Sequence, residues 1–219
     1  MEQNLVEEQT KEKTSGKSSS IWGIILFLIL VLVDQLTKLV ADAYLDKGDG
    51  FAIIEGWLGI TFTYNRGISY GMGSDASPYL KIGVIALTAV MMAVIAVVFF
   101  KLDKRRVWLK VACVLIVAGG VGNLIDRVYY RVWDPATYPY GVRDMVDLSR
   151  FGFAVCNFAD FFISIGAVML VFAFIFFDKD AFFPIGKYKE LAQEAIEEDK
   201  RKEEERKAKK QAEKDKKNG

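Results

Sequence analysis

The side chains of this chain that could do chemistry are mostly aspartates, asparagines and basic residues, because the sequence contains no histidine. That absence excludes Ser-His-Asp and Cys-His catalysis and every His-ligated metal site. The two cysteines, Cys113 and Cys156, are too few for a cysteine-rich zinc site and do not form a Cys-x-x-Cys pair. We therefore expect no metal and no cofactor, and hydrolysis would need carboxylates or a Ser-Lys pair.

The polar residues of interest gather where long apolar segments end. Within each group the spacing is three or four residues, so the side chains share one face of a helix. An ionisable group inside a bilayer costs about 2.5–3.5 kcal/mol, so each needs a reason to be there. The set comprises Asp34, Lys38, Asn123, Asp126, Arg127, Asn157 and Asp160, with Asp147 in the loop before the last group.

Four apolar segments, at 21–40, 79–100, 107–128 and 158–177, are long enough to cross a membrane. Basic residues crowd the loop at 101–106 and both ends of the chain, which favours a cytoplasmic location for all three regions. The sequence thus predicts an all-α membrane protein with four transmembrane helices and cytoplasmic N and C termini. The loops 41–78 and 129–157 then lie outside, and the polar groups converge at the outer face.

The remaining segments complete the predicted organisation. The β-branched and aromatic stretch 51–72 predicts two or three short strands on the outer surface. We expect a cytoplasmic tail at 1–20, a membrane domain at 21–184 and a charged cytoplasmic tail at 185–219. The first apolar segment could be a cleaved signal peptide, but its apolar run continues past Asp34 and Lys38, which favours a retained helix.

Two neighbouring carboxyl groups could carry the hydrolysis. They cannot both ionise cheaply, so one keeps a proton and serves as the acid while the other takes a proton from water. Spacing leaves the pair undecided among Asp126, Asp147 and Asp160. Because Arg127 follows Asp126 and would hold it ionised, that consideration favours Asp147 with Asp160. For Asp34 and Lys38 the plainer interpretation is a structural ion pair.

These residues and their order resemble the lipoprotein signal peptidases, also called signal peptidase II. The resemblance covers roughly 21–178, and its motifs occur in the family's order. They are DQLTK at 34–38, NRG at 65–67, GGVGNLIDR at 119–127, VDL at 146–148 and NFAD at 157–160.

The resemblance implies an aspartyl endopeptidase of the bacterial cytoplasmic membrane, with its active site on the extracytoplasmic face. Such enzymes cleave diacylglyceryl-modified prolipoproteins on the amino side of the lipidated cysteine. The implied catalytic residues are Asp147 and Asp160, and a small outer sheet, the β-cradle, is expected. The expected partners are prolipoproteins and membrane lipids, without nucleic acid, and we expect a monomer. The implied substrate-binding and supporting residues are Asn65, Gly67, Asn123, Arg127, Asn157, Asp34, Lys38 and Asp126.

The chain departs from the family pattern at three places. Ile68-Ser69-Tyr70 stands where small residues and then an aromatic are usual, and Cys156 replaces a phenylalanine. The stretch from 127 to 146 is longer than usual. This length leaves Asp144 as an alternative to Asp147, although 145–148 matches better with Asp147.

Two other functions are compatible with parts of the sequence. A Ser-Lys protease could pair Ser69 or Ser74 with Lys38. A small transporter could use the aspartates as a proton or ion path, although this leaves the outer strands unexplained.

Overall fold

The computed structural model describes residues 2–67, 72–103, 106–178 and 180–218, without the side chains of 2–20, 203, 207 and 209–218. The chain divides into two compact units, Met1–Val168 and Met169–Gly219. The first unit holds all the polar groups predicted to form the site.

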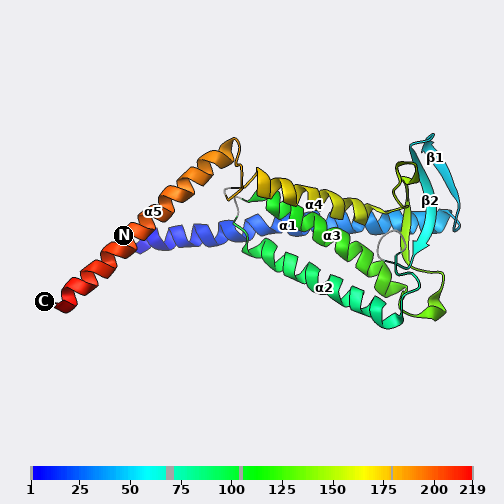
Figure 1. Ribbon diagram of the computed structural model, residues 1–219, viewed down its shortest axis with the longest axis horizontal. Helices are drawn as coiled ribbons and strands as arrows, with labels where there is room; N and C mark the ends of the chain where they lie inside the picture. Colours follow the sequence, from blue (N-terminus) through cyan, green and yellow to red (C-terminus); the bar gives the residue numbers. More distant parts are fainter. Residues whose placement is uncertain (1, 68–71, 104–105, 179, 219) are drawn as a thin grey trace. The chain divides into compact units, whose positions relative to one another are not determined.

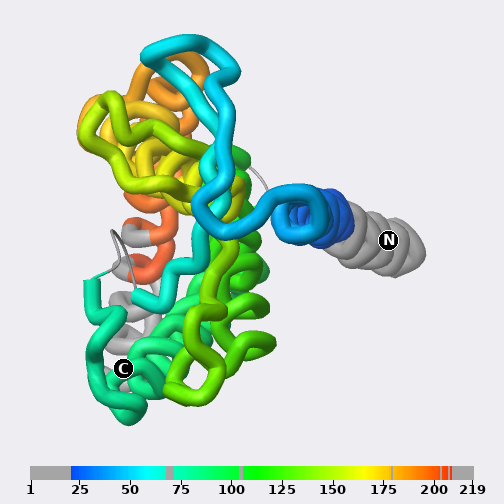
Figure 2. The backbone as a smooth tube through the Cα atoms, turned by 90° about the vertical axis from the view of Figure 1, so that its right-hand side faces the viewer, coloured from blue at the N-terminus to red at the C-terminus, as the bar shows by residue number. Residues whose placement is uncertain are grey.

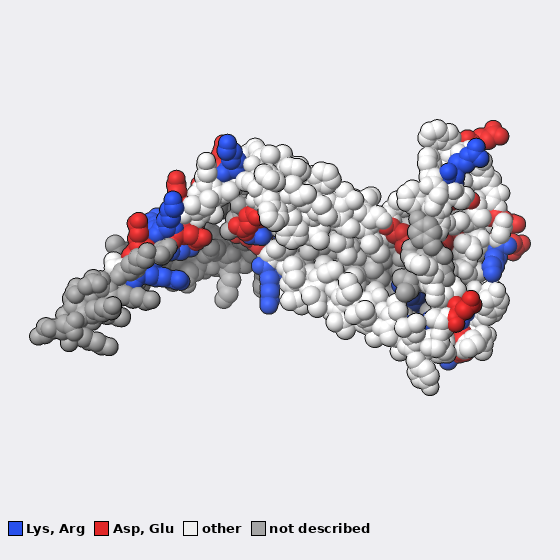
Figure 3. All heavy atoms as spheres, viewed as in Figure 1, with Lys and Arg blue, Asp and Glu red and all other residues white. Residues whose placement is uncertain are grey.

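The described part of the chain contains four helices that are long and apolar enough to cross a membrane, which confirms the four predicted spans. They are α1 (Glu2–Tyr44), α2 (Pro78–Lys101), α3 (Val107–Tyr129) and α4 (Phe158–Ile175), shown in Figure 1. The first helix continues through the stretch expected as an N-terminal tail. In Figure 3 the surface over the middle of the helices shows no charged side chain on the visible face, as a surface that contacts lipid requires.

Helix α3 is the centre of the first unit, since it packs against α1, α2 and α4. Glycines allow this close approach. A Cβ on Gly119 would lie 2.3 Å from the Ala159 carbonyl oxygen of α4, and one on Gly120 would lie 2.1 Å from the Met92 sulfur of α2. A Cβ on Gly122 would lie 2.5 Å from a carboxylate oxygen of Asp34 on α1. The glycine-rich stretch therefore brings three helices against one.

The small sheet has three antiparallel strands in the order β1 (Gly50–Ile54), β2 (Leu58–Asn65) and β3 (Val142–Asp147). The first two form the hairpin expected from the alternating stretch, drawn in cyan in Figure 2. The third strand comes from the second long loop, 129–157, where the sequence predicted no strand. Pairing of Asn65 with Val142 joins the two loops above the helix ends.

A buried cluster attaches this sheet to the helices. It contains Phe62 of β2, Met145 and Val146 of β3, and Ala41 near the end of α1. Phe62 is 1% exposed. Because this cluster packs between the strands and the end of α1, the sheet is held over the polar groups of the helix ends.

The second unit contains the end of α4 and the charged helix α5 (Lys187–Asn218). Tyr188 is buried and its ring contacts that of Phe177 edge-on. An exposed ion pair joins Lys202 to Glu198 one turn earlier. Such pairs support a solvated helix by about 0.3–0.5 kcal/mol each.

The close packing of α3 predicts the effect of a single methyl group. Gly119→Ala should lower the free energy of unfolding by about 1–3 kcal/mol, because the added Cβ meets backbone of α4 that cannot move away alone. Gly83→Ala on α2 is the matched control, since its Cβ would meet nothing within 4 Å. Unfolding in detergent micelles measures both. Equal midpoints for the two variants would contradict this account of the packing.

Candidate active site

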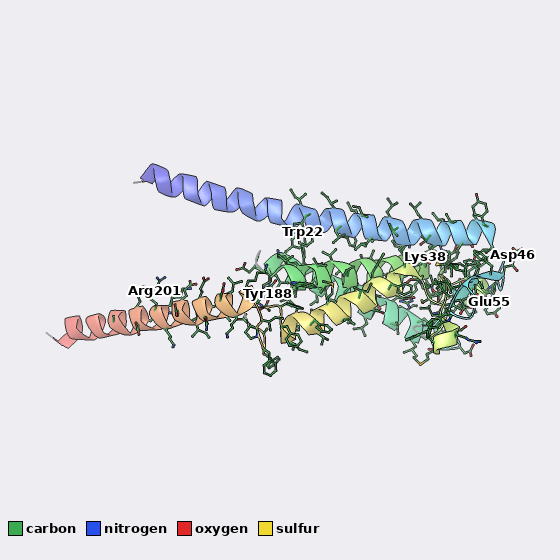
Figure 4. All side chains as sticks on the ribbon, turned by 90° about the horizontal axis from the view of Figure 1, so that it is seen from above. Trp22, Lys38, Asp46, Glu55, Tyr188 and Arg201 are labelled. Carbon is green, nitrogen blue, oxygen red and sulfur yellow. The ribbon has the colours of Figure 1, made fainter. Side chains whose placement is uncertain are left out.

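A buried lysine lies at the centre of the polar groups. Lys38 is 0% exposed, and its ammonium lies 2.8 Å from Asp34, 3.0 Å from the Asn123 side-chain oxygen and 3.6 Å from Asp126. Figure 4 places Lys38 on α1 toward the end that carries the strands, and Trp22 near the middle of that helix. The predicted pair of Asp34 with Lys38 is thus present, within a larger network that also includes α3.

Two asparagines extend this network away from the lysine. The Asn123 side-chain oxygen accepts from Lys38 and from the Asn157 amide at 3.0 Å, so its own amide must donate elsewhere. It donates to Asp160 at 2.8 Å. The Asn157 amide also donates to Asp144 at 2.6 Å. Because an ammonium only donates, Lys38 determines the orientation of both amides, and both point a donor at an aspartate.

The beginning of α4 is a reciprocal cap that includes one of the aspartates. The Asn157 side chain accepts from the Asp160 N–H, and Asp160 accepts from the Asn157 N–H, both at 3.1 Å. Asp34 accepts from the Ala159 N–H at 2.9 Å. These bonds satisfy three N–H groups at the helix start. They also hold the half-buried Asp160 carboxylate at a helix N terminus, where negative charge is favourable.

Asp144 of β3 is the second aspartate at this point. It is 2% exposed, and both Asn157 and Asn65 hydrogen-bond its carboxyl group. Burial first, and the charge of Asp160 second, raise the pKa of Asp144 to about 7, while the two hydrogen bonds oppose the rise. Asp144 and Asp160 are therefore an interacting pair in which Asp144 retains a proton more readily than an exposed aspartate.

Asp147, predicted as the partner of Asp160, lies in a different environment. Along a strand, residues three apart point to opposite faces, so Asp147 and Asp144 face away from each other. Asp147 accepts from Thr61 at 2.8 Å and from the Ser149 N–H at 2.9 Å. The bonds with Ser149 and then Thr61 lower its pKa. The geometry thus replaces Asp147 by Asp144 as the partner of Asp160. The sequence Asp147-Leu148-Ser149 is typical of a turn in which the aspartate accepts from the backbone two residues later.

Asp126 is a structural residue, as expected, but its main partner is Arg143, which the sequence analysis missed. The Arg143 guanidinium donates to Asp126 at 2.7 and 3.3 Å, and its backbone N–H donates at 3.0 Å. Arg143 also donates to Gln35 of α1 at 3.2 Å. Both Asp126 and Arg143 are buried, so this ion pair ties β3 to α3 and α1.

Three further predicted residues lie at the end of β2. The Asn65 side-chain oxygen accepts from the Gly67 N–H at 2.9 Å, which leaves its amide free to donate to Asp144. Arg127 donates to the Gly67 carbonyl at 3.4 Å. It also attracts three carboxylates, most strongly Asp160, then Asp144, then Asp126. Asn65 and Arg127 therefore interact with the pair Asp144 and Asp160, and Gly67 connects them.

A small cavity of about 90 Å³ opens beside Gly67 and Arg127, between the start of α2 and the end of α3. Its walls are mostly apolar. The lining residues include Ala76, Leu80, Val84, Ile85 and Val132. An apolar group could therefore lie close to the aspartate pair.

Some of the residues at which the chain departs from the family pattern lie within the described part of the structure. Ile68-Ser69-Tyr70 lies outside the described residues. Cys156 forms a backbone bridge with Val146, and burial raises the pKa of its thiol to about 12, so it is not a reactive thiolate. The Ser74 carbonyl accepts from Lys81, whereas Lys38 binds Asp34 and Asn123, so Lys38 does not activate Ser74.

A membrane-spanning bundle that holds two interacting aspartates at one end, in a chain without histidine, defines the class of membrane aspartic peptidases. A family model described as signal peptidase (SPase) II matches residues 26–176, more than half of the chain. The chain belongs to the signal peptidase II family and is a multi-pass bacterial membrane peptidase.

Individual relatives agree with this assignment. The lipoprotein signal peptidase of Fusobacterium nucleatum is 33% identical over 158 residues, covering 71% of this chain and 87% of that protein. The lipoprotein signal peptidase of Borreliella burgdorferi is 32% identical over 165 residues, covering 72% and 92%. A bacterial membrane enzyme solved by the in meso method at 2.3 Å is similar with a TM-score of 0.57 and 28% identity, covering 69% of this chain and 85% of that one.

The raised pKa of Asp144 predicts how stability changes with pH. Between about pH 4 and pH 7 the unfolded chain has lost this proton while the folded protein keeps it, so the free energy of unfolding falls as pH rises. Asp144→Asn removes this loss. The variant should therefore gain stability over wild type at pH 8, on the order of 3 kcal/mol, and gain little at pH 4.

Asp147→Asn should show the opposite sign, because its pKa is lowered in the folded protein. Its wild-type carboxylate stabilises the fold above the ordinary aspartate pKa, so the variant loses stability at neutral pH and not in acid. Thermal unfolding in detergent at both pH values measures the two differences. A gap between Asp144→Asn and wild type that does not change with pH would refute the proposed buried proton.

Proposed function

We propose that this protein removes the signal peptide from diacylglyceryl-modified prolipoproteins by cleaving on the amino side of the lipidated cysteine, with Asp144 and Asp160 as the catalytic pair. The family assignment supports the reaction. The observation that supports the pair is the meeting of Asp144 and Asp160 through the Asn123 and Asn157 amides at the mouth of the bundle.

The two carboxyl groups have environments suited to different roles. Buried Asp144 retains its proton up to about pH 7, so it can donate a hydrogen bond to the scissile carbonyl while water attacks and then transfer that one proton to the leaving amine. Asp160 accepts two N–H hydrogen bonds at a helix N terminus, an environment suited to an anion that takes a proton from the attacking water. Arg127 would balance part of the negative charge. Loss of the Asp144 proton at high pH should stop the reaction.

Substrate placement follows from the position of the pair. Acyl chains on the substrate cysteine stay in the bilayer, so the neighbouring peptide bond is held at the level of the helix ends. The apolar cavity beside Gly67 and Arg127 suits an apolar part of this substrate. Binding energy from the acyl chains would thus help to position the scissile peptide bond, although the acyl chains take no part in the reaction. We also propose that the protein acts as a monomer.

We also propose the orientation suggested by the basic loops: both chain ends in the cytoplasm, and the sheet and the aspartate pair on the extracytoplasmic side. The residues 1–20 and 185–219 would then be cytoplasmic tails around a membrane domain at 21–184. The four alternating spans support this arrangement, since they place 101–106 and both ends on one side.

Three aspartate variants test the catalytic pair. Asp144→Asn and Asp160→Asn should each lower the cleavage rate about 10²–10⁴-fold, because each removes one proton-transfer group. Asp147→Asn should cleave at close to the wild-type rate. A gel-shift assay with purified protein and diacylglyceryl-modified prolipoprotein measures the rates.

Folding controls accompany this assay. Asn at 144 can still accept from Asn157, so the variant should remain folded. The pair is rejected if Asp144→Asn retains normal turnover, or if Asp147→Asn is inactive while folded. Ser69→Ala and Ser74→Ala should remain active, whereas a Ser-Lys protease would lose activity with one of them.

Labelling of single cysteines tests the orientation. In a background with both native cysteines replaced, Glu55→Cys in the exposed β1–β2 turn should react with an impermeant maleimide in intact cells. Arg201→Cys in α5 should react only after permeabilisation, because it lies in the proposed cytoplasm. Figure 4 labels both positions. Labelling of Arg201→Cys in intact cells would contradict the orientation.

A further inference from the structure

Arg66 is a buried cation that also lines the apolar cavity beside Gly67 and Arg127. It is 9% exposed, and its guanidinium donates four hydrogen bonds to the segment 132–140 of the second long loop. The carbonyl oxygens of Val132 and Asp134 lie 2.8 Å from one guanidinium nitrogen. The other nitrogen lies 2.9 Å from the Tyr140 carbonyl and 3.2 Å from the Thr137 hydroxyl.

The neighbours of Arg66 both touch the site. Asn65 hydrogen-bonds Asp144, and the Gly67 carbonyl accepts from Arg127. The Asn65 backbone is itself pressed against the loop, since a Cβ on Gly141 would lie 2.4 Å from the Asn65 carbonyl oxygen. Asn65 and Gly67 thus contact Asp144 and Arg127, and Arg66 between them binds the 132–140 segment.

We propose that Arg66 is a positioning residue: by binding the 132–140 segment it fixes the Asn65–Gly67 backbone, and so the aim of the Asn65 amide at Asp144. This inference rests on the proposed catalytic pair. The 132–140 segment lies between α3 and β3, so a connecting loop supports the end of β2.

The physical reason is the small tolerance of a proton-transfer site. Misplacing a catalytic group by 1 Å can cost about 10²-fold in rate. A guanidinium suits the task because its planar fork can bind several carbonyl oxygens at once, which a lysine ammonium cannot do with the same geometry. The four acceptor oxygens lie in and on both sides of a short 3₁₀ turn, Pro135–Thr137.

The primary experiment measures the cleavage rate of Arg66→Ala at saturating substrate. We expect kcat to fall at least about tenfold with KM changed less than threefold. Arg66→Lys should recover only part of the rate. Arg131→Ala is the matched control, because the Arg131 side chain forms an ion pair with Asp134 of the same segment, is 62% exposed, and its backbone contacts stay in the variant. It should behave as wild type.

The pH dependence of kcat separates positioning from general loss of structure. The Asn65 hydrogen bond lowers the pKa of Asp144, so losing it in Arg66→Ala should move the high-pH limb to higher pH. The other charges that act on Asp144 are Asp160 of α4, Lys38 of α1 and Arg127 of α3. All three remain in the variant.

A double-mutant cycle with Asn65→Ala identifies the route of the effect. If Arg66 acts through Asn65, then Arg66→Ala should lower kcat by less than about twofold when Asn65 is already alanine. Single-turnover assays with enzyme in excess keep slow variants measurable. Full additivity, or an unshifted pH limb in Arg66→Ala, overturns the proposal. If Arg66→Ala does not fold, Arg66→Lys and Thr137→Ala enter the same cycle with the same criteria.

Failure of this inference differs from failure of the proposed function. Inactive Asp144→Asn and Asp160→Asn with a normal Arg66→Ala would reject only the positioning role. Normal cleavage by the two aspartate variants would reject the catalytic pair itself, whatever Arg66 does.

Discussion

The burial of the Lys38 ammonium constrains everything around it. A charged group with no exposed surface in an apolar bundle is tolerated only when acceptors surround it. Asp34, Asn123 and Asp126 supply these acceptors from two helices. Because the ammonium only donates, the Asn123 side-chain oxygen must face Lys38 and its amide nitrogen must face away. The direction of the other hydrogen bonds in the network follows from this orientation.

The network transmits this polarity to the aspartates and fixes how the elements meet. Asn123 and Asn157 each face an acceptor on one side and offer a donor on the other. In an apolar interior a partly satisfied network is costly, so α1, α3, α4 and β3 are held in one mutual register. Gly119 and Gly122 make this register possible, since a side chain on either would separate the helices.

The chemical difference between Asp144 and Asp147 arises from their burial and their hydrogen bonds. Asp144 and Asp147 stand three residues apart on one strand, yet their pKa values move in opposite directions. Asp144 is buried beside the negative charge of Asp160. Asp147 accepts from a turn and from Thr61 at the sheet surface. One strand therefore carries an acid suited to retaining a proton and an ordinary structural carboxylate.

The four spans and the convergence of polar groups could be predicted from the sequence, because apolar length and helical spacing are local properties. The absence of histidine narrowed the chemistry to carboxylates or a Ser-Lys pair, and the family resemblance then pointed to aspartates and to Asn65, Asn123, Asn157 and Asp160. Tertiary structure decided that Asp144 rather than Asp147 accompanies Asp160, since the face of β3 that meets α4 depends on its pairing with a strand from another loop.

The contributions of Arg143 and Arg66 were likewise decided by the tertiary structure. Arg143 pairs with Asp126, seventeen positions away, and Arg66 binds carbonyl oxygens about seventy positions away. Backbone carbonyls occur at every residue, so no pattern of side chains in the sequence marks which of them a buried guanidinium will bind. Such partners are selected only when the chain folds and the cost of burying the charge has to be met.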